Sequence, residues 1–195
     1  MRTSRLEAFS DGVLAIIITI MVLELKVPEQ PTLASLSHSA TGFLTYLLSF
    51  VYIGIYWNNH HHMFHVVEHI DGLVLWANLH LLFWLSLFPF MTGWMGENHF
   101  APMPTALYGF VLFMAAIAYF ILQQLIIRDQ GSGSILKRAV GGDWKGKVSP
   151  MAYAIAMPMA FFAPWVSMAL YVAVALVWLV PDRRIEHALA GPGHG

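Results

Sequence analysis

Histidine is the residue type with the clearest chemical potential in this 195-residue chain, and it is concentrated in one segment. Five histidines lie between residues 60 and 69 and another follows closely: His60, His61, His62, His65, His69 and His80. On a helix, His61 and His65 share a face, as do His65 and His69, because each pair is four residues apart. Imidazole nitrogens at this spacing suit zinc or iron. One hypothesis is therefore a metal-dependent enzyme embedded in a membrane.

The positions of the later histidines argue against that hypothesis. Membrane di-iron hydroxylases and desaturases carry HxxxH and HxxHH boxes near the ends of their spans, and they need further boxes late in the chain. After His80 the histidines are isolated, at His99, His187 and His194. A polar interfacial segment that titrates near neutral pH explains the cluster with fewer assumptions. No metal ligand is assigned, and the His-cluster enzyme is kept as the alternative.

A carboxylate, Asp11, and a guanidinium, Arg5, lie in or beside the first apolar stretch of the chain. An ionisable group on a membrane helix is costly to bury unless it is paired, so it is a candidate functional group by default. Asp11 has two interpretations: it either contacts a permeating ion or ties its helix to a neighbouring helix. We favour the tie because Asp11 faces away from the most apolar side of its own helix.

A helix over residues 5–25 has two unlike faces. With Ile16 as the reference, the following side chains lie within roughly 60° of it: Phe9, Gly12, Thr19, Ile20 and Leu23. Ser10 and Asp11 lie about 120° and 140° away. The apolar face is either a pore lining or a surface for packing or lipid, and periodicity does not distinguish them. The chain contains no TVGYG-like carbonyl filter and no arginine-rich voltage sensor.

The composition predicts an all-α, polytopic integral membrane protein. Hydrophobic residues make up 58% of the chain and charged residues only 11%, whereas a soluble domain is about a quarter charged. The seven tryptophans suit interfacial belts and packed bundles. The absence of cysteine excludes disulfides and thiolate metal sites. The stretch after Met1 lacks a signal-peptidase site and is expected to be retained. No nucleic-acid partner is expected.

Hydropathy predicts six transmembrane helices, at roughly 7–27, 40–60, 73–94, 105–127, 147–162 and 164–180. The His-rich stretch either follows the second span or extends its helix. Residues 148–180 are too long for one span and slightly short for two. Pro158 and Pro164 either bend one long helix or mark a turn between two helices, and we predict two.

Charge predicts that both termini are cytoplasmic. With six spans and this orientation, nine of the ten basic residues fall on the cytoplasmic side and only Lys26 falls outside. The chain shows no internal repeat. We therefore predict one membrane domain of six transmembrane helices over residues 1–182, which would be the channel domain, and a short disordered tail over residues 183–195.

Several residues in the first half occur in an ordered pattern. Arg5-x-x-x-Phe9-Ser10-Asp11 opens the first span, Trp57-x-x-His60-x-x-x-Phe64 closes the second, and Asp71, Asn78 and Pro89 follow. This set resembles the signature of the lysosomal and bacterial potassium channel family of transmembrane protein 175. The likeness reaches from Arg5 to about Pro89, nearly half of the chain, and the remainder agrees only in hydropathy.

The resemblance implies a passive, modestly potassium-selective cation channel and not an enzyme. It implies a homotetramer whose four first helices line a central pore with a hydrophobic constriction that serves as gate and filter. The constriction falls on Ile16, with Ile20 and Leu23 toward the extracellular side and Thr19 as the neighbouring hydroxyl. A polar network that holds the helices together falls on the motif residues: Arg5, Phe9, Ser10, Asp11, Gly12, Trp57, His60 and Asn78. His61, His62, His65 and His69 fall outside the family pattern.

The expected permeant ion is K+, with other monovalent cations or protons as further permeants, and no cofactor is implied. The expected location is a bacterial plasma membrane, with the lipid bilayer as surroundings. Two other hypotheses stay open at this point. One is the membrane-embedded metal enzyme, and the other is a non-conducting relative that serves as a structural membrane partner.

Overall fold

The computed structural model describes residues 3–67, 69–131, 134, 136–137 and 144–179, and these residues are almost entirely helical. The helices follow in this order: α1 (Thr3–Leu23), α2 (Leu33–His38), α3 (Ala40–His65), α4 (Gly72–Ser86), α5 (Phe88–Glu97), α6 (Pro102–Gln130), α8 (Trp144–Met159) and α9 (Pro164–Leu179). The all-α class expected from composition is confirmed.

Local chemistry sets several helix ends. Asp71 caps α4, because its carboxylate accepts a 2.8 Å hydrogen bond from the backbone N–H of Val74. Pro102 stands at the start of α6, where its missing N–H costs nothing. Gly131 ends α6 with a φ of 73°, a conformation that only glycine adopts without strain.

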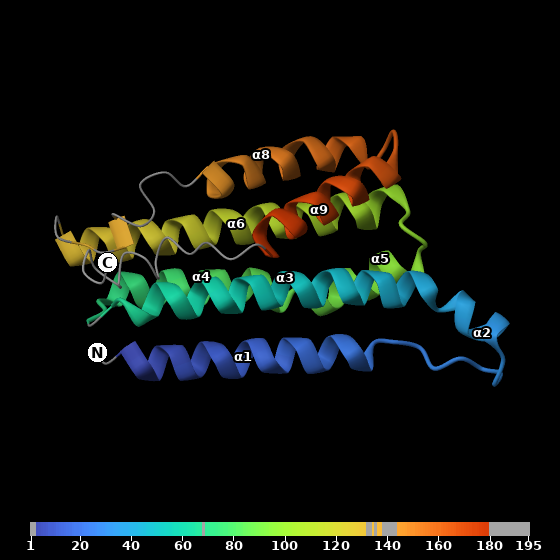
Figure 1. Cartoon of the computed structure of the whole chain (residues 1–195), viewed down its shortest axis with the longest axis horizontal. Helices are drawn as coiled ribbons and strands as arrows, with labels where there is room; N and C mark the ends of the chain where they lie inside the picture. Colours follow the sequence, from blue (N-terminus) through green and yellow to red (C-terminus); the bar gives the residue numbers. More distant parts are fainter. Residues whose placement is uncertain (1–2, 68, 132–133, 135, 138–143, 180–195) are drawn as a thin grey trace, which may run out of the picture.

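The long helices alternate in direction and lie in layers (Figure 1). α1 packs on one side of α3, α4 and α5, and α6 and α9 pack on the other. α8 contacts α6 and α9 and forms the layer farthest from α1. α1 is therefore the only helix of the described chain on that side of the bundle. One of its faces packs on the other helices, and the opposite face does not.

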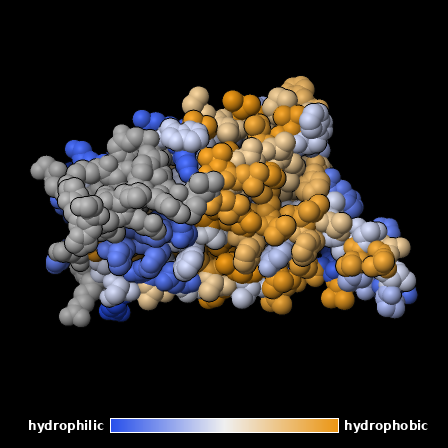
Figure 2. All heavy atoms as spheres, in the orientation of Figure 1, coloured by the Kyte–Doolittle hydropathy of each residue, from blue (hydrophilic) through white to orange (hydrophobic). Residues whose placement is uncertain are grey.

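An apolar band crosses the middle of the visible face of the molecule (Figure 2). Figure 2 shows apolar residues across the central part of the visible face and hydrophilic residues toward both ends of the long axis. Four helical segments of the described chain are long and apolar enough to cross a membrane: Thr3–Leu23, Ala40–His65, Gly72–Glu97 and Pro102–Gln130. The protein is thus a multi-helix membrane protein.

The structure refines the predicted spans. The helix of the second span runs on to His65, so the His-rich stretch extends that helix. The third span is not one helix, because α4 stops at Ser86 and α5 starts at Phe88, next to Pro89. The loop predicted at residues 29–39 contains the short helix α2.

The last apolar region forms two helices. α8 ends at Met159, and α9 begins at Pro164 and returns alongside it. Each has 16 residues and is therefore about 24 Å long, short of the roughly 30 Å hydrocarbon core. The predicted tail over residues 183–195 lies outside the described residues.

Candidate functional site

α1 is two-sided in the structure. Its buried side chains recur every three or four residues: Leu6, Ser10, Leu14, Ile17 and Met21. This face packs on α3, α4 and α5. The opposite face is exposed along its whole length. We call the packed side the anchored face of α1 and the exposed side its open face.

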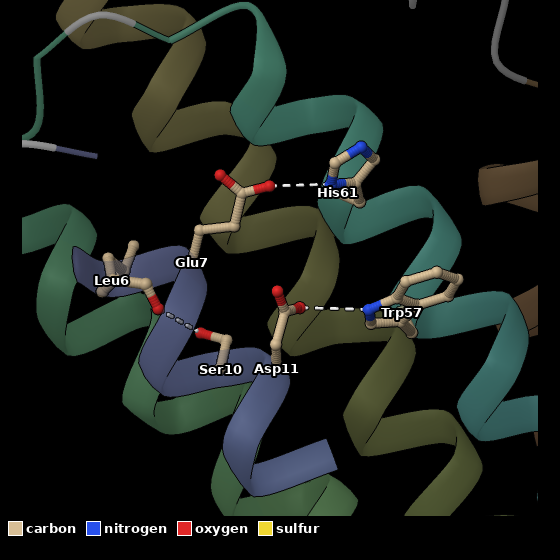
Figure 3. Close-up of polar contacts among 6 residues, drawn as sticks. All are labelled: Leu6, Glu7, Ser10, Asp11, Trp57 and His61. Atoms are coloured by element: carbon tan, nitrogen blue, oxygen red, sulfur yellow. Dashed lines mark hydrogen bonds and ion pairs between the residues drawn. The ribbon is translucent and has the colours of Figure 1, made fainter. Parts of the chain in front are cut away.

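A buried chain of polar groups anchors α1 to α3 and α4. The Ser10 hydroxyl donates to the Leu6 carbonyl of its own helix at 2.9 Å (Figure 3) and accepts from Asn78 Nδ2 of α4 at 2.9 Å. Asn78 Oδ1 lies 2.8 Å from His60 Nε2 of α3. Because the Asn78 amide nitrogen already donates to Ser10, its oxygen is the acceptor, and His60 Nε2 carries the proton.

The three members of this chain are almost fully buried, since Ser10 and Asn78 are 0% exposed and His60 is 1% exposed. The His60 ring also packs on Phe64, with 4.5 Å between ring centres. Buried polar groups are costly when unpaired, so this geometry fixes both the separation and the rotation of the three helices.

Two more exposed contacts between α1 and α3 lie beside this buried chain of hydrogen bonds. Asp11 Oδ1 accepts a 3.0 Å hydrogen bond from Trp57 Nε1, and Glu7 Oε1 lies 2.7 Å from His61 Nδ1 (Figure 3). All four groups point into the space between α1 and α3. Asp11 therefore ties its helix to a neighbour, which is the interpretation that sequence analysis favoured.

The far half of α1 is held by apolar packing instead. Ile17 and Met21 are 3% and 0% exposed. The only polar contact described for this half of the buried face is the Thr92 hydroxyl of α5, 3.8 Å from the Met21 sulfur. Thr92 also lies 2.6 Å from the Ser49 hydroxyl of α3, inside the bundle. The polar anchors of α1 are thus concentrated in its first three turns.

The predicted constriction residues all lie on the open face of α1. Ile16 is 58%, Ile20 41% and Leu23 81% exposed. Thr19 is exposed as well, and its hydroxyl donates to the Ile16 carbonyl at 2.8 Å, so its oxygen remains available as an acceptor. Among the described residues no helix packs over this face, and it presents an apolar stripe with one hydroxyl oxygen.

Three of the predicted network residues are not brought into the network. Phe9 is 53% exposed on the open face, and Gly12 is exposed with no heavy atom within 4 Å of where its Cβ would be. Arg5 is exposed and forms no ion pair with another described residue. Ser10, Asp11, Trp57, His60 and Asn78 are the members that the fold brings together.

The Glu7–His61 contact was missed by sequence analysis. A signal for it exists, because Glu7 and Asp11 are four residues apart on α1, and so are Trp57 and His61 on α3. Two antiparallel helices with matching four-residue steps place these groups opposite one another in pairs. That reading requires knowing that α1 and α3 are in contact, which the spacing alone does not show.

The histidine cluster does not converge. His60 points inward to Asn78, whereas His61 reaches Glu7, and His65 and His69 are exposed. Among the described residues, no three histidine, aspartate or glutamate side chains are grouped so that they could hold a metal ion. The i, i+4 spacing does place the His61 and His65 rings side by side, with 6.1 Å between ring centres, but the described residues do not complete a metal site around them.

Comparison with known proteins gives a family match over the part of the chain that contains the ordered motif. The sequence profile of the family described as "Endosomal/lysosomal potassium channel TMEM175" matches residues 5–89. A potassium channel of Chryseobacterium sp. (strain P1-3) is 56% identical over 189 residues, which is 97% of this chain and 98% of that protein. The endosomal/lysosomal proton channel TMEM175 of Danio rerio is 29% identical over 128 residues, 63% of this chain but 24% of that longer protein.

The fold has a solved counterpart. The crystal structure of a lysosomal potassium-selective channel TMEM175 homolog from Chamaesiphon minutus superposes with a TM-score of 0.78 at 29% identity. The match covers 92% of this chain and 97% of that one. These relatives are channels, and none of them supports the His-cluster enzyme. The expected resemblance is confirmed, and the chain belongs to the TMEM175 family.

Proposed function

We propose that this protein is a potassium-permeable cation channel in which four copies of α1 surround a central pore. The observation that carries the proposal is the open face of α1, where Ile16, Ile20 and Leu23 are exposed while the opposite face is anchored. A fourfold arrangement would bring these stripes together around one axis. The potassium channels named among the relatives support the choice of ion.

The narrow point is a ring of Ile16 side chains, continued by Ile20 and Leu23. An apolar ring of this kind gates by expelling water, because a thin water column between hydrocarbon walls is unstable. Selectivity then comes from pore size and from the cost of partly dehydrating the ion, so it is weaker than that of a carbonyl filter. Thr19 is the one polar group on the stripe and offers a hydroxyl oxygen to a cation that has lost part of its water.

The mouth beyond Leu23 is electrostatically suited to cations. α1 ends there, and the carbonyls of a helix C-terminus carry a partial negative charge. Glu24 and Glu29 follow and are both exposed. In a tetramer these groups are repeated four times around the axis, which raises the local cation concentration.

The polar anchors give the pore helix a pivot. Ser10 and Asp11 fix the first turns of α1, whereas the half that carries Ile16 and Ile20 is held mainly by apolar packing. Side chains without directed bonds slide at lower cost than hydrogen-bonded ones. A modest rotation about the anchored end would therefore widen the ring and admit water.

The proposed topology has six crossings and both termini in the cytoplasm of a bacterial plasma membrane. The alternating directions of α1, α3, α4–α5, α6, α8 and α9 support an even number of crossings (Figure 1). α8 and α9 are short by about one turn each, a mismatch that local bilayer thinning accommodates. A proton leak through the same pore is part of the proposal, in keeping with the proton channels among the relatives.

Ion flux from liposomes that contain the purified protein tests this function, first under a potassium gradient and then under a sodium gradient. We expect larger flux for potassium. Ile16→Asn should increase the flux and reduce the preference for potassium over sodium, because an amide in the ring keeps it hydrated. Ile155→Asn on α8 is the matched control, since Ile155 is 57% exposed and Ile16 is 58% exposed.

Two results would contradict the proposal. If Ile16→Asn and Ile155→Asn leave flux and selectivity equally unchanged, Ile16 does not line the pore. If folded wild-type protein passes neither ion under any gradient, the protein is a non-conducting relative with a structural role.

A further inference from the structure

Three buried hydroxyl groups lie in a row behind the far half of α1, beyond the polar anchors of its first turns. The Ser49 hydroxyl of α3 is in the middle, 2.6 Å from that of Thr92 on α5 and 2.9 Å from that of Tyr108 on α6. The Thr92 hydroxyl also donates to the Met21 sulfur of α1 at 3.8 Å. None of these four side chains is more than 3% exposed. The row therefore joins α6, α3 and α5 to α1 inside the bundle.

The sulfur atom at the end of this row fixes the direction of every hydrogen bond in it. A thioether accepts hydrogen bonds but has no proton to donate, so the single Thr92 hydroxyl proton goes to Met21. Thr92 must then accept from Ser49, and Ser49 must accept from Tyr108. The reverse direction would leave the Tyr108 proton without an acceptor among the described residues. We call this directed row, from Tyr108 through Ser49 and Thr92 to Met21, the hydroxyl chain.

The position of α5 brings Thr92 to α1. α4 stops at Ser86 and α5 starts at Phe88, so the second part of this span is a separate short helix. It packs on α1, α3 and α6, toward the end of the bundle where α1 ends and α2 lies (Figure 1). Thr92 follows one turn after Phe88 and is, within the described part of the chain, the only residue of α5 that makes a hydrogen bond to α1.

Helical geometry links Met21 to the open face of α1. Each residue turns the helix by 100°, so Met21 lies about 100° from Ile20 and about 140° from Ile16. Hydrophobic packing is non-directional, whereas a hydrogen bond weakens once its donor and acceptor lose their alignment. The contact between Thr92 and Met21 is therefore a directional restraint on a part of α1 that is otherwise held by apolar packing.

We propose that Thr92 is a positioning residue for the pore, because the hydroxyl chain, through Met21, holds α1 in the rotation that directs Ile16 and Ile20 toward the axis. This inference rests on the proposed channel and concerns the same helix. Rotation of α1 moves the Met21 sulfur away from Thr92, and one buried hydroxyl proton of the chain then loses its acceptor. Because that loss is unfavourable, the hydroxyl chain favours the narrow state of the Ile16 ring.

Potassium flux from liposomes that contain the full chain tests this role with Thr92→Val, which keeps the shape of the side chain and removes its hydroxyl. We expect flux roughly two- to fivefold above the wild-type level, since one hydrogen bond to a weak sulfur acceptor is lost. Met21→Leu should raise the flux by a similar factor, because it removes the acceptor at nearly constant volume. The double variant should show no more flux than either single variant, because both side chains act through one contact.

Two further variants separate the hydroxyl from a general effect on packing. Thr92→Ser restores a hydroxyl and should return the flux to near the wild-type level. Thr105→Val on α6 is the matched control, because Thr105 is also buried but its hydroxyl has no hydrogen-bond partner among the described residues. The same chemical change at residue 105 should leave the flux unaltered.

The possible failures are distinguishable. Additive effects of Thr92→Val and Met21→Leu would overturn the proposal, and so would equal flux for Thr92→Ser and Thr92→Val, because the hydroxyl would not act through the sulfur. If Thr92→Val leaves the flux unchanged whereas Ile16→Asn raises it, the pore assignment stands and the hydroxyl chain serves only the stability of the fold. If folded wild-type protein passes no ion, the channel and this inference fall together.

Discussion

Asn78 is the residue on which the attachment of α1 depends most. Asn78 lies on α4. Its side-chain Nδ2 donates to Ser10 of α1, and its Oδ1 accepts from His60 of α3. One side chain thus joins three helices in a fully buried position. An apolar residue at this position would leave the buried His60 Nε2–H without its hydrogen-bond acceptor and the Ser10 hydroxyl without its donor.

Asn78→Ala should lower the free energy of unfolding by about 1–3 kcal/mol for the buried groups that it leaves unpaired. The effect is measured as thermal or denaturant unfolding in detergent. Asn98→Ala is the control, because Asn98 is exposed and its side chain bonds only the Trp94 carbonyl of the helix that it ends. Equal losses for the two variants would show that the Ser10–Asn78–His60 chain contributes nothing specific.

The pairing of α3 with α5 depends on Gly96. A Cβ on Gly96 would lie 2.9 Å from the Gly42 Cα and 3.3 Å from the Thr45 hydroxyl, closer than side-chain carbons approach backbone atoms. The missing side chain of Gly96 lets the two backbones come together near the end of the bundle that carries α2. This contact also positions Thr92, one turn earlier on α5, against Met21 of α1.

Gly96→Ala should therefore destabilise the protein by about 1–3 kcal/mol, because the added methyl group pushes α5 away from α3. Gly93→Ala, one turn away on the same helix, should be neutral or stabilising by up to about 1 kcal/mol, since alanine favours the helix. The nearest atom to a Cβ on Gly93 is the Glu24 Oε2 at 3.7 Å, an ordinary contact. Unfolding midpoints of the two variants compare them directly, and a larger loss for Gly93→Ala would refute the close-packing account.

At the scale of the whole molecule, the open face of α1 must be covered by lipid, by other subunits or by the water of a pore. A single chain leaves Ile16, Ile20 and Leu23 exposed on its outermost helix, and the proposed arrangement of four chains around an axis would convert that face into a pore. The chain contains no cysteine, so single introduced thiols report on assembly without background.

Leu23→Cys should form covalent dimers and higher species with a short bis-maleimide cross-linker, because the four α1 helices meet around the axis of the proposed tetramer. Phe162→Cys, in the turn between α8 and α9, should remain monomeric on the same gel. The two positions are matched in exposure, at 81% and 85%. Cross-linking at residue 162 but not at residue 23 would place the subunit contacts on the opposite side of the bundle.

Labelling of intact bacterial cells with a membrane-impermeant maleimide tests the topology. Ser37→Cys in α2 should react, because the proposed topology of six crossings with cytoplasmic termini places α2 outside. Asp129→Cys near the end of α6 should react only after the cells are permeabilised. Both side chains are exposed on the surface of the chain, so a difference in reactivity would report the side of the membrane and not burial within the protein. The reverse pattern would invert the proposed orientation.

The sequence by itself determined what depends on local pattern. Low charge and long apolar stretches required a membrane protein of helices, and the step of 100° per residue separated Ile16 from Ser10 and Asp11 on α1. The ordered motif from Arg5 to Pro89 identified the family. Each of these signals lies within one helix or in the order of residues along the chain, so no knowledge of packing was needed.

Only the tertiary structure decided which side chains meet. It brought Asn78 to Ser10 and His60, paired Glu7 with His61, and left Phe9 and Gly12 on the open face although they belong to the same motif. These contacts join residues from different helices, and their geometry depends on how closely and at what rotation the helices pack, which a one-dimensional pattern does not encode.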